Sequence, residues 1–350
     1  MATTLHPAVT TPNLTTELDA LLHGAGVAQL TDRAFLRITG ADATRWLNGM
    51  VTNSIESLKL GEGNYNFLLN AQGRIQGDCT IYREPGDTNP AFLLETTASQ
   101  IDTIQQLLDK FIIMDDVELQ PATSNLQTLT ILGPKAPKLV EQYYKSFRAG
   151  GRPDLTALRL SFFSESGDLT ITLAAPLVPR IEIRTLNAAE ITRNLLANGA
   201  IEISPEALEA LRILEGTPLY GTDIRDKDLP QETAQTRALH FSKGCYLGQE
   251  IVERIHSRGA VHRTFTGFEL TGALPPTGTP LTADSTPDSK PIGELTSVAS
   301  IQLPTRATPI QLALGYIRRE ALDRNVPLQY PGGTATPITL PYQPSLTTYP

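Results

Sequence analysis

The sequence predicts an α+β fold with two related sheet-and-helix units followed by a C-terminal β-barrel. Strand-like and helix-like segments alternate through the first two thirds of the 350 residues, and one short pattern recurs at two strand-to-helix junctions. After Phe265, helical periodicity becomes sparse and short β-like segments follow one another. The 26 glycines and 26 prolines indicate many turns between short elements.

The first unit is predicted over residues 28–122, after a loose leader over residues 1–27. The leader is rich in Thr and Pro, contains one or two helical turns, and ends in Gly24-Ala25-Gly26, which is more typical of a helix stop than of a dinucleotide loop. Asp42 is a suitable N-cap for a helix that ends at Met50. The remaining elements are predicted as strands at 28–39, 65–69, 74–82 and 91–95, and a helix at 99–111.

The second unit is predicted over residues 123–262 and repeats this order. Residues 38–43 and 131–136 both read Ile-x-Gly-x-x-Ala, which favours two similar units, although six residues alone are also compatible with chance. Gly199 ends one helix, and Ser204 begins the next. The predicted strands are 126–132, 158–163 and 169–174, and the predicted helices start at 134, 188 and 204.

The β-barrel is predicted over residues 263–330. Its strands are expected at 264–270, 292–298 and 312–317, with a Gly-, Pro- and Ser-rich loop between the first two. Residues 331–350 are rich in Pro and Thr and are predicted to form an irregular tail.

Composition and missing motifs restrict the function. The net charge of −8 and pI of about 5.2 disfavour sequence-independent nucleic-acid binding. No P-loop, HExxH or GxSxG motif is present, so the sequence offers no anchor for ATP, zinc-protease or hydrolase chemistry. No apolar run approaches the roughly 20 residues that span a bilayer, and no signal peptide is evident. We therefore expect a cytoplasmic protein without membrane contact.

The two cysteines, Cys79 and Cys245, are too few for a disulfide framework or for an all-cysteine metal site within one chain. We expect both to be reduced thiols. Cys245 lies in the segment Lys243–Glu250, where glycines permit close backbone approach. A nearby lysine and a helix that starts at Gln249 would favour its thiolate, whereas a small buried side chain in a tight turn is the alternative.

A cationic cluster follows this segment. A solvated charged face is the usual meaning of such a cluster, and a pocket for a carboxylated ligand is the functional alternative. Direct tRNA binding is a further, weaker alternative that rests on this cluster alone. The cluster consists of Arg254, His256, Arg258, His262 and Arg263.

The motif Lys-Gly-Cys-Tyr-x-Gly-Gln-Glu at residues 243–250 resembles the signature of the YgfZ-type folate-binding proteins, relatives of the glycine-cleavage aminomethyltransferase. The segments 36–49, 69–75, 211–221 and 312–317 are also similar to that family, so the resemblance runs from about residue 28 to about residue 330. It implies a GcvT-like three-domain ring with tetrahydrofolate, or a derivative, in its central cavity.

The resemblance implies a folate-binding accessory protein in iron–sulfur cluster assembly or repair, with an indirect effect on tRNA modification. Its partners would be iron–sulfur assembly proteins or iron–sulfur enzymes. Cys245 and Lys243 would be the working residues, and the cysteine could handle a one-carbon unit, sulfur or iron. The candidate cofactor-binding residues are Asp78, Arg237, Gln249, Arg263 and Glu215.

Two positions depart from the aminomethyltransferase pattern. Gly77-Asp78 retains only one carboxylate of the expected Asp-Asp pair. Leu214 occupies the position of the pterin-contacting glutamate, and Glu215 follows it, rotated by about 100° on a helix. Whether the chain is an enzyme is therefore open. A tetrahydrofolate-dependent aminomethyltransferase and a non-catalytic protein-interaction adaptor are the alternatives.

Overall fold

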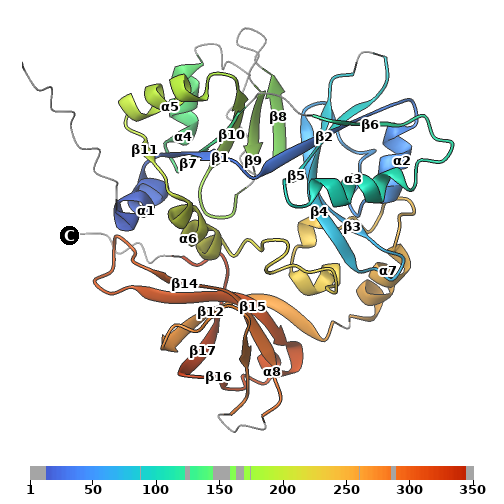
Figure 1. Cartoon of the computed structure of the whole chain (residues 1–350). Helices are drawn as coiled ribbons and strands as arrows, with labels where there is room; N and C mark the ends of the chain where they lie inside the picture. The colour runs from blue at the N-terminus through green and yellow to red at the C-terminus, as the bar shows by residue number, and fades with distance from the viewer. Residues whose placement is uncertain are drawn as a thin grey trace, which may run out of the picture.

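The computed structural model describes residues 13–86, 88–122, 127–144, 158–162, 169–173, 175–259, 261–284 and 289–343. It forms three lobes around a centre that the segment between α6 and α7 crosses (Figure 1). Two lobes are the halves of an eleven-stranded sheet with helices, and the third is a six-stranded barrel. The predicted α+β fold, with two sheet-and-helix units and a barrel in a three-domain ring, is confirmed.

The first half of the large sheet has the strand order β3-β4-β5-β2-β6. Helices α2 and α3 pack their apolar sides, including Trp46 and Ile104, against one face of it. The elements are β2 (Arg33–Thr39), α2 (Ala43–Met50), β3 (Glu62–Leu69), β4 (Ile75–Glu84), β5 (Ala91–Thr97), α3 (Ile101–Asp109) and β6 (Glu118–Pro121).

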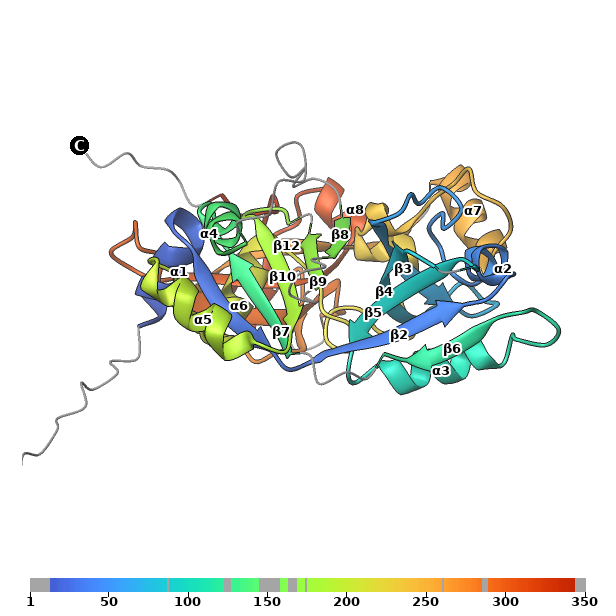
Figure 2. The ribbon, with the colours of Figure 1, turned by 90° about the horizontal axis from the view of Figure 1, so that it is seen from above.

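The second half has the order β11-β1-β7-β10-β9-β8 and joins the first half where β8 pairs with β3 (Figure 2). Helices α4 and α5 pack against it. The elements are α1 (Leu14–His23), β1 (Gly26–Leu30), β7 (Gln127–Leu132), α4 (Ala136–Tyr143), β8 (Leu158–Phe162), β9 (Leu169–Leu173), β10 (Arg180–Thr185), α5 (Ala188–Ala197), β11 (Ile201–Glu202) and α6 (Pro205–Glu215).

The predicted single strand region 28–39 is wrong, because the chain forms two strands that belong to different halves. Strand β1 pairs with β7 and β11, whereas β2 pairs with β5 and β6. Both strands are apolar on a buried side, so the pattern of residues looks continuous although the pairing partners change. The predicted loose leader is also corrected, since α1 is a capped helix over Leu14–His23 that ends at Gly24.

The two Ile-x-Gly-x-x-Ala segments form the same junction in both halves. Gly40 and Gly133 have φ values of +133° and +106°, which other residues rarely adopt. In each copy, the amide two residues after the glycine donates to the carbonyl of a crossing segment, Asp116 in the first and Gly24 in the second. A Cβ at either glycine would collide with that same carbonyl, so the pattern is structural.

Helix α2 begins next to Asp42, as predicted, but the Asp42 side chain does not cap it. Its carboxylate accepts a hydrogen bond from the amide of Asp116 at 2.9 Å instead. Helix α4 begins at Ala136, two residues after the predicted start. The Ser204 prediction is confirmed, because its side chain accepts from the amide of Ala207 at the start of α6.

The barrel is one antiparallel sheet in the order β13-β14-β15-β12-β17-β16. Reciprocal backbone hydrogen bonds of 2.9 Å between Thr282 and Gln329 bring its two edges together. Its elements are β12 (Arg263–Gly272), β13 (Thr279–Leu281), β14 (Gly293–Ile301), β15 (Ile310–Arg318), α8 (Arg319–Asp323), β16 (Leu328–Tyr330) and β17 (Gly333–Ile338). The predicted irregular tail is wrong at Gly333–Ile338, where β17 pairs with β12 and buries Ala335.

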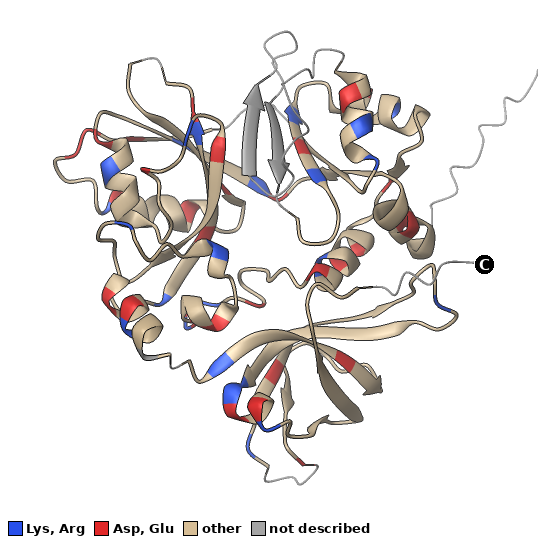
Figure 3. Cartoon of the chain, turned by 180° about the vertical axis from the view of Figure 1, so that it is seen from behind, with Lys and Arg blue, Asp and Glu red and all other residues tan. Residues whose placement is uncertain are grey.

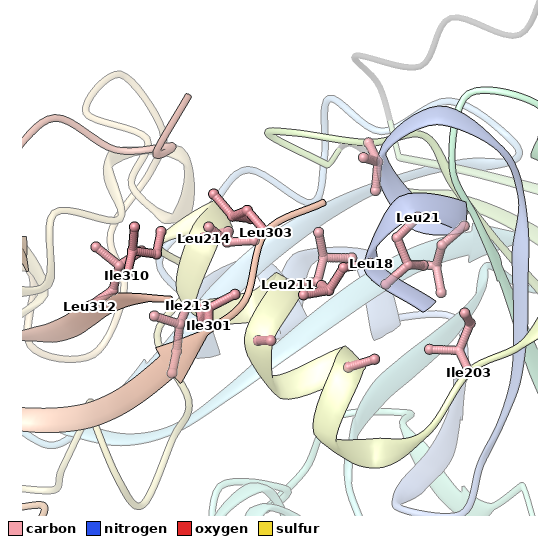
Figure 4. Packing of buried hydrophobic residues seen from close by; sticks show 14 of the residues in the cluster. Leu18, Leu21, Ile203, Leu211, Ile213, Leu214, Ile301, Leu303, Ile310 and Leu312 are labelled. Atoms are coloured by element: carbon pink, nitrogen blue, oxygen red, sulfur yellow. The ribbon is translucent and has the colours of Figure 1, made fainter. Parts of the chain in front are cut away.

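Helix α6 connects the second half to the barrel. Its residues Leu211 and Leu214 are fully buried, between Leu18 of α1 and Leu312 of the barrel (Figure 4). Gly216, at φ +71°, ends the helix and sends the chain into the centre of the ring. In the described ranges, no helix is long and apolar enough to cross a membrane.

Candidate functional site

Asp78 lies on β4, next to the end of its pairing with β5, which begins at Thr80. Asp78 therefore has no backbone partner on β5, and the side chain of Gln100 bonds to it instead. The Gln100 side chain accepts from the Asp78 amide at 3.1 Å and donates to Asp78 Oδ1 at 2.8 Å. On the other side, the Tyr65 hydroxyl of β3 donates to Asp78 Oδ2 at 2.5 Å. Two hydrogen bonds, one to each oxygen, therefore fix the carboxylate in one orientation.

Burial raises the pKa of Asp78, although the hydrogen bonds from Tyr65 and Gln100 and the charge of Arg237 act in the opposite direction. Burial likewise raises the pKa of Tyr65 well above its usual value, as does the neighbouring Asp78. The carboxylate thus lies where charge is costly and a hydrogen-bond donor is favoured. Neither Tyr65 nor Gln100 was expected from the sequence, because both reach Asp78 from other segments.

Arg237, in the short 3₁₀ helix η2 (Thr236–Ala238), faces this group from the central segment. Its guanidinium carbon lies 4.9 Å from the centre of the Tyr65 ring, and its side chain is exposed. Its positive charge favours the ionised forms of both Asp78 and Glu215. The structure therefore brings three of the predicted residues into one electrostatic environment.

Glu215 is the last residue of α6, and its side chain is 1% exposed. Oε2 accepts from Arg180 Nη2 at 3.2 Å, whereas Oε1 is buried without a hydrogen-bond partner. Burial raises the pKa of this carboxyl, whereas the charge of Arg180 and hydrogen bonds from the backbone amides of Val178 and Leu177 oppose the rise. Leu214, by contrast, is a core residue. The carboxylate at this end of α6 is therefore that of Glu215, one residue later on the helix.

Lys243 holds the cysteine loop against the end of α2. Its Nζ donates to the carbonyls of Asn48, Val51 and Asn53 at 2.6, 2.8 and 2.6 Å. These are carbonyls at a helix C-terminus, where a cation is favoured. Burial lowers the pKa of Lys243 to about 7, whereas three carbonyl acceptors engage all three ammonium protons and act in the opposite direction. The geometry supports a positioning role for this lysine.

Cys245 is a free, exposed cysteine on the loop that Lys243 holds, three residues before Gly248, the N-cap of α7 (Gln249–Arg258). Its carbonyl lies beside Gly49 of α2. The other free thiol, Cys79, is buried, and burial raises its pKa well above the usual value. Cys245 is therefore the thiol that can meet another molecule, and the alternative of a buried side chain in a tight turn is excluded.

The remaining two candidates lie elsewhere. Gln249 accepts from the Tyr246 amide at 3.3 Å within the cysteine loop. Arg263 donates to Asp228 at 2.6 Å and to Glu232 at 3.0 Å, which ties the barrel to the central segment. The roles predicted for both in folate binding stay predictions. Within the described residues, no three His, Cys, Asp or Glu side chains gather in a way that could hold a metal ion.

Comparison with known proteins places this fold. Residues 6–164 match the family model described as the GCVT N-terminal domain. The fold is that of the glycine cleavage system aminomethyltransferase T from Bartonella henselae, with a TM-score of 0.80 at 18% identity over 94% of this chain and 89% of that one. This similarity defines the class of fold and, at 18% identity, no more than the fold.

Individual relatives fall into several groups. An aminomethyltransferase from Bacillus mycoides is 26% identical over 341 residues, which are 93% of this chain and 88% of that protein. A putative chloroplastic transferase from Arabidopsis thaliana is 25% identical over 310 residues, 87% of this chain and 68% of that protein. A mitochondrial iron–sulfur cluster assembly factor IBA57 homologue from Neurospora crassa is 27% identical over 248 residues, or 68% of this chain and about half (52%) of that protein.

Proposed function

We propose that this chain binds tetrahydrofolate or a derivative beside Asp78, Arg237 and Glu215 and serves as an accessory protein in iron–sulfur cluster assembly, with Cys245 as its reactive thiol. The observation that carries the proposal is the convergence of a half-buried carboxylate, a buried carboxylate and an exposed guanidinium at the centre of a fold shared with an aminomethyltransferase. Similarity to the IBA57 homologue supports the iron–sulfur role.

The residues fit a reduced folate. A tetrahydropterin carries several N–H donors, and its glutamate tail carries carboxylates. Glu215 Oε1 is a buried acceptor without a partner, which is an arrangement that a donor on a ligand would complete. Asp78 is a second acceptor that Tyr65 and Gln100 hold in place. Arg237 supplies an exposed cation of the type that grips carboxylates. When bound, the folate would supply a carrier for a one-carbon unit.

The environment of Asp78 separates this proposal from the aminomethyltransferase alternative. Gly77 precedes it, so there is one carboxylate, and both of its oxygens already accept hydrogen bonds. Each oxygen keeps a further lone pair that can accept from a ligand, so the group is suited to orienting a bound ligand. The match along 88% of the Bacillus mycoides enzyme keeps aminomethyl transfer as the second candidate. Transfer from a loaded carrier protein to tetrahydrofolate is the assay that distinguishes them.

The first test is calorimetry with tetrahydrofolate under anaerobic, reducing conditions. We expect Asp78→Ala to weaken binding at least tenfold, because it removes a charged acceptor worth more than about 1.4 kcal/mol. Cys245→Ala should bind as the parent does, because the thiol acts in a later step. Failure of the parent to bind any mono- or polyglutamylated reduced folate would remove the folate part of the proposal and favour the adaptor alternative.

The iron–sulfur part is tested in cells that lack the gene. We expect Cys245→Ser, expressed at the parent level, to leave iron–sulfur enzymes less active than the parent does. An effect on tRNA modification should follow as an indirect one, through loss of an iron–sulfur modifying enzyme. Full restoration of those enzymes by Cys245→Ser would contradict a working role for the thiol.

A further inference from the structure

The loop between α3 and β6 carries three exposed apolar side chains that its surroundings leave without a partner. Phe111 is 39% exposed, Ile113 82% and Met114 94%, and we call these three residues the apolar tip. Burying an Ile or a Met side chain is favourable by about 1.5–3 kcal/mol. A contiguous group of this kind marks an interaction site more often than do single exposed residues. Figure 2 shows the loop projecting at one end of the molecule.

The apolar tip is held rigidly. Trp46 Nε1 of α2 donates to the carbonyl of Phe111 at 3.0 Å. Arg45 Nη2 donates to Asp115 at 2.5 Å, and reciprocal contacts between Asp42 and Asp116 close the loop at its far end. Because both ends are fixed to α2, a binding partner would lose little affinity to ordering of the loop.

The rim of the apolar tip is acidic. The segment 109–118 contains four carboxylate side chains and a single lysine. They are Asp109, Asp115, Asp116 and Glu118, against Lys110; Arg45 of α2 pairs with Asp115, and the net charge stays negative. Figure 3 shows acidic residues along this loop. An anionic membrane surface would repel this rim, whereas an apolar pocket edged by Lys and Arg would complement it.

The apolar tip and the cysteine loop both contact helix α2. Trp46 contacts Phe111, and Gly49, three residues further along α2, lies against Cys245 and accepts from the amide of Leu247 at 3.1 Å. Residues three apart on a helix are surface neighbours. Figure 2 shows α2 between this loop and α7. The tip and the loop that carries the exposed thiol are therefore held by one helix.

We propose that the apolar tip is the docking anchor for a partner protein that presents an apolar pocket edged by lysine and arginine, and that docking there brings the partner to Cys245. The link to Cys245 rests on the proposed function, in which that thiol acts on a partner protein and a docking surface positions the partner.

The test places a photo-crosslinking amino acid at position 114 of the full chain, in cells that express it. The matched control places it at position 186, since Leu186 is an apolar residue of similar exposure, 68%, beyond the end of β10. We expect an adduct with another protein from position 114, none of the same mass from position 186, and loss of the adduct when Ile113→Asp is added.

The cross-linked protein is then purified and its affinity measured. Ile113→Asp should weaken binding by about 10- to 100-fold, and Leu186→Asp should leave it unchanged. Raising the salt concentration should weaken the parent complex, because the rim contribution is screened. Thermal unfolding should be the same for parent and Ile113→Asp, since the side chain lies at the surface.

Four results would overturn the proposal: no adduct, an adduct of two copies of this chain, an adduct indifferent to Ile113→Asp, or a partner whose contact surface lacks cations. Tetrahydrofolate binding by Ile113→Asp separates this inference from the proposed function. If the parent binds no folate but forms the adduct, the folate proposal fails and the docking surface stands. If Ile113→Asp binds folate normally and keeps its adduct, the docking surface fails alone.

Discussion

Replacing Lys243 by methionine should loosen the cysteine loop without altering the rest of the fold. The substitution removes three hydrogen bonds from an ammonium group to carbonyls at the end of α2. Hydrogen bonds to charged groups contribute about 1.5–3 kcal/mol each. Because Lys243 is half-buried and the freed carbonyls can bind water, we expect a total loss of about 2–4 kcal/mol.

Hydrogen exchange measures this loss locally. The amide of Leu247, which donates to Gly49 across the loop, should exchange roughly 30- to 900-fold faster in Lys243→Met, at tenfold per about 1.4 kcal/mol. The measurement is made at pH 6, below the lowered pKa of about 7, where the ammonium form is present. Lys59→Met, at an exposed lysine, is the control and should change nothing. Equal protection of Leu247 in parent and Lys243→Met would refute the positioning role.

Three further predictions concern stability. Gly133→Ala should lower the free energy of unfolding by more than about 2 kcal/mol, because its Cβ would lie 2.6 Å from the Gly24 carbonyl oxygen. Gly199→Ala meets no atom within 4 Å and should cost only about 1–2 kcal/mol, and denaturant titration measures both. Leu211→Ala in the core around α6 should cost about 2–5 kcal/mol, and a smaller effect on urea unfolding would contradict its burial. Burial, together with the nearby charge of Glu182, raises the pKa of Glu95 from 4.5 to about 7. Between these pH values the folded state binds more protons than the unfolded state, so the free energy of unfolding should fall as pH rises. Denaturant titrations at pH 5 and pH 7.5 should show this fall in the parent and not in Glu95→Gln.

Local signals in the sequence located most of the elements. The helix from Ser204, the two Ile-x-Gly-x-x-Ala junctions and three of the six barrel strands follow from caps, glycines and apolar periodicity, which act within a few residues. The split between β1 and β2 and the pairing of β17 could not be found in this way. Both depend on which distant strand lies alongside, and that choice leaves no mark on the residues of the strand itself.

The candidate site divides in the same way. The motif around Cys245 indicated an unusual loop, and the structure confirms that the thiol is exposed. Tyr65 and Gln100 were missed because they meet Asp78 from another strand and from the start of a helix. The departure at Leu214 was visible in the sequence, but only packing shows that the leucine is core and that Glu215 retains a buried, unpartnered oxygen.

By itself the sequence determined most of the helices, many of the strands and which thiol to examine, because those properties depend on neighbours along the chain. The tertiary structure alone decided that Lys243 holds the cysteine loop against α2, that Asp228 accepts a hydrogen bond from Arg263, and that the apolar tip and the cysteine loop both contact α2. These are contacts between segments from tens of residues to almost two hundred residues apart. Their geometry follows from how the sheets and the barrel pack, which no local pattern encodes.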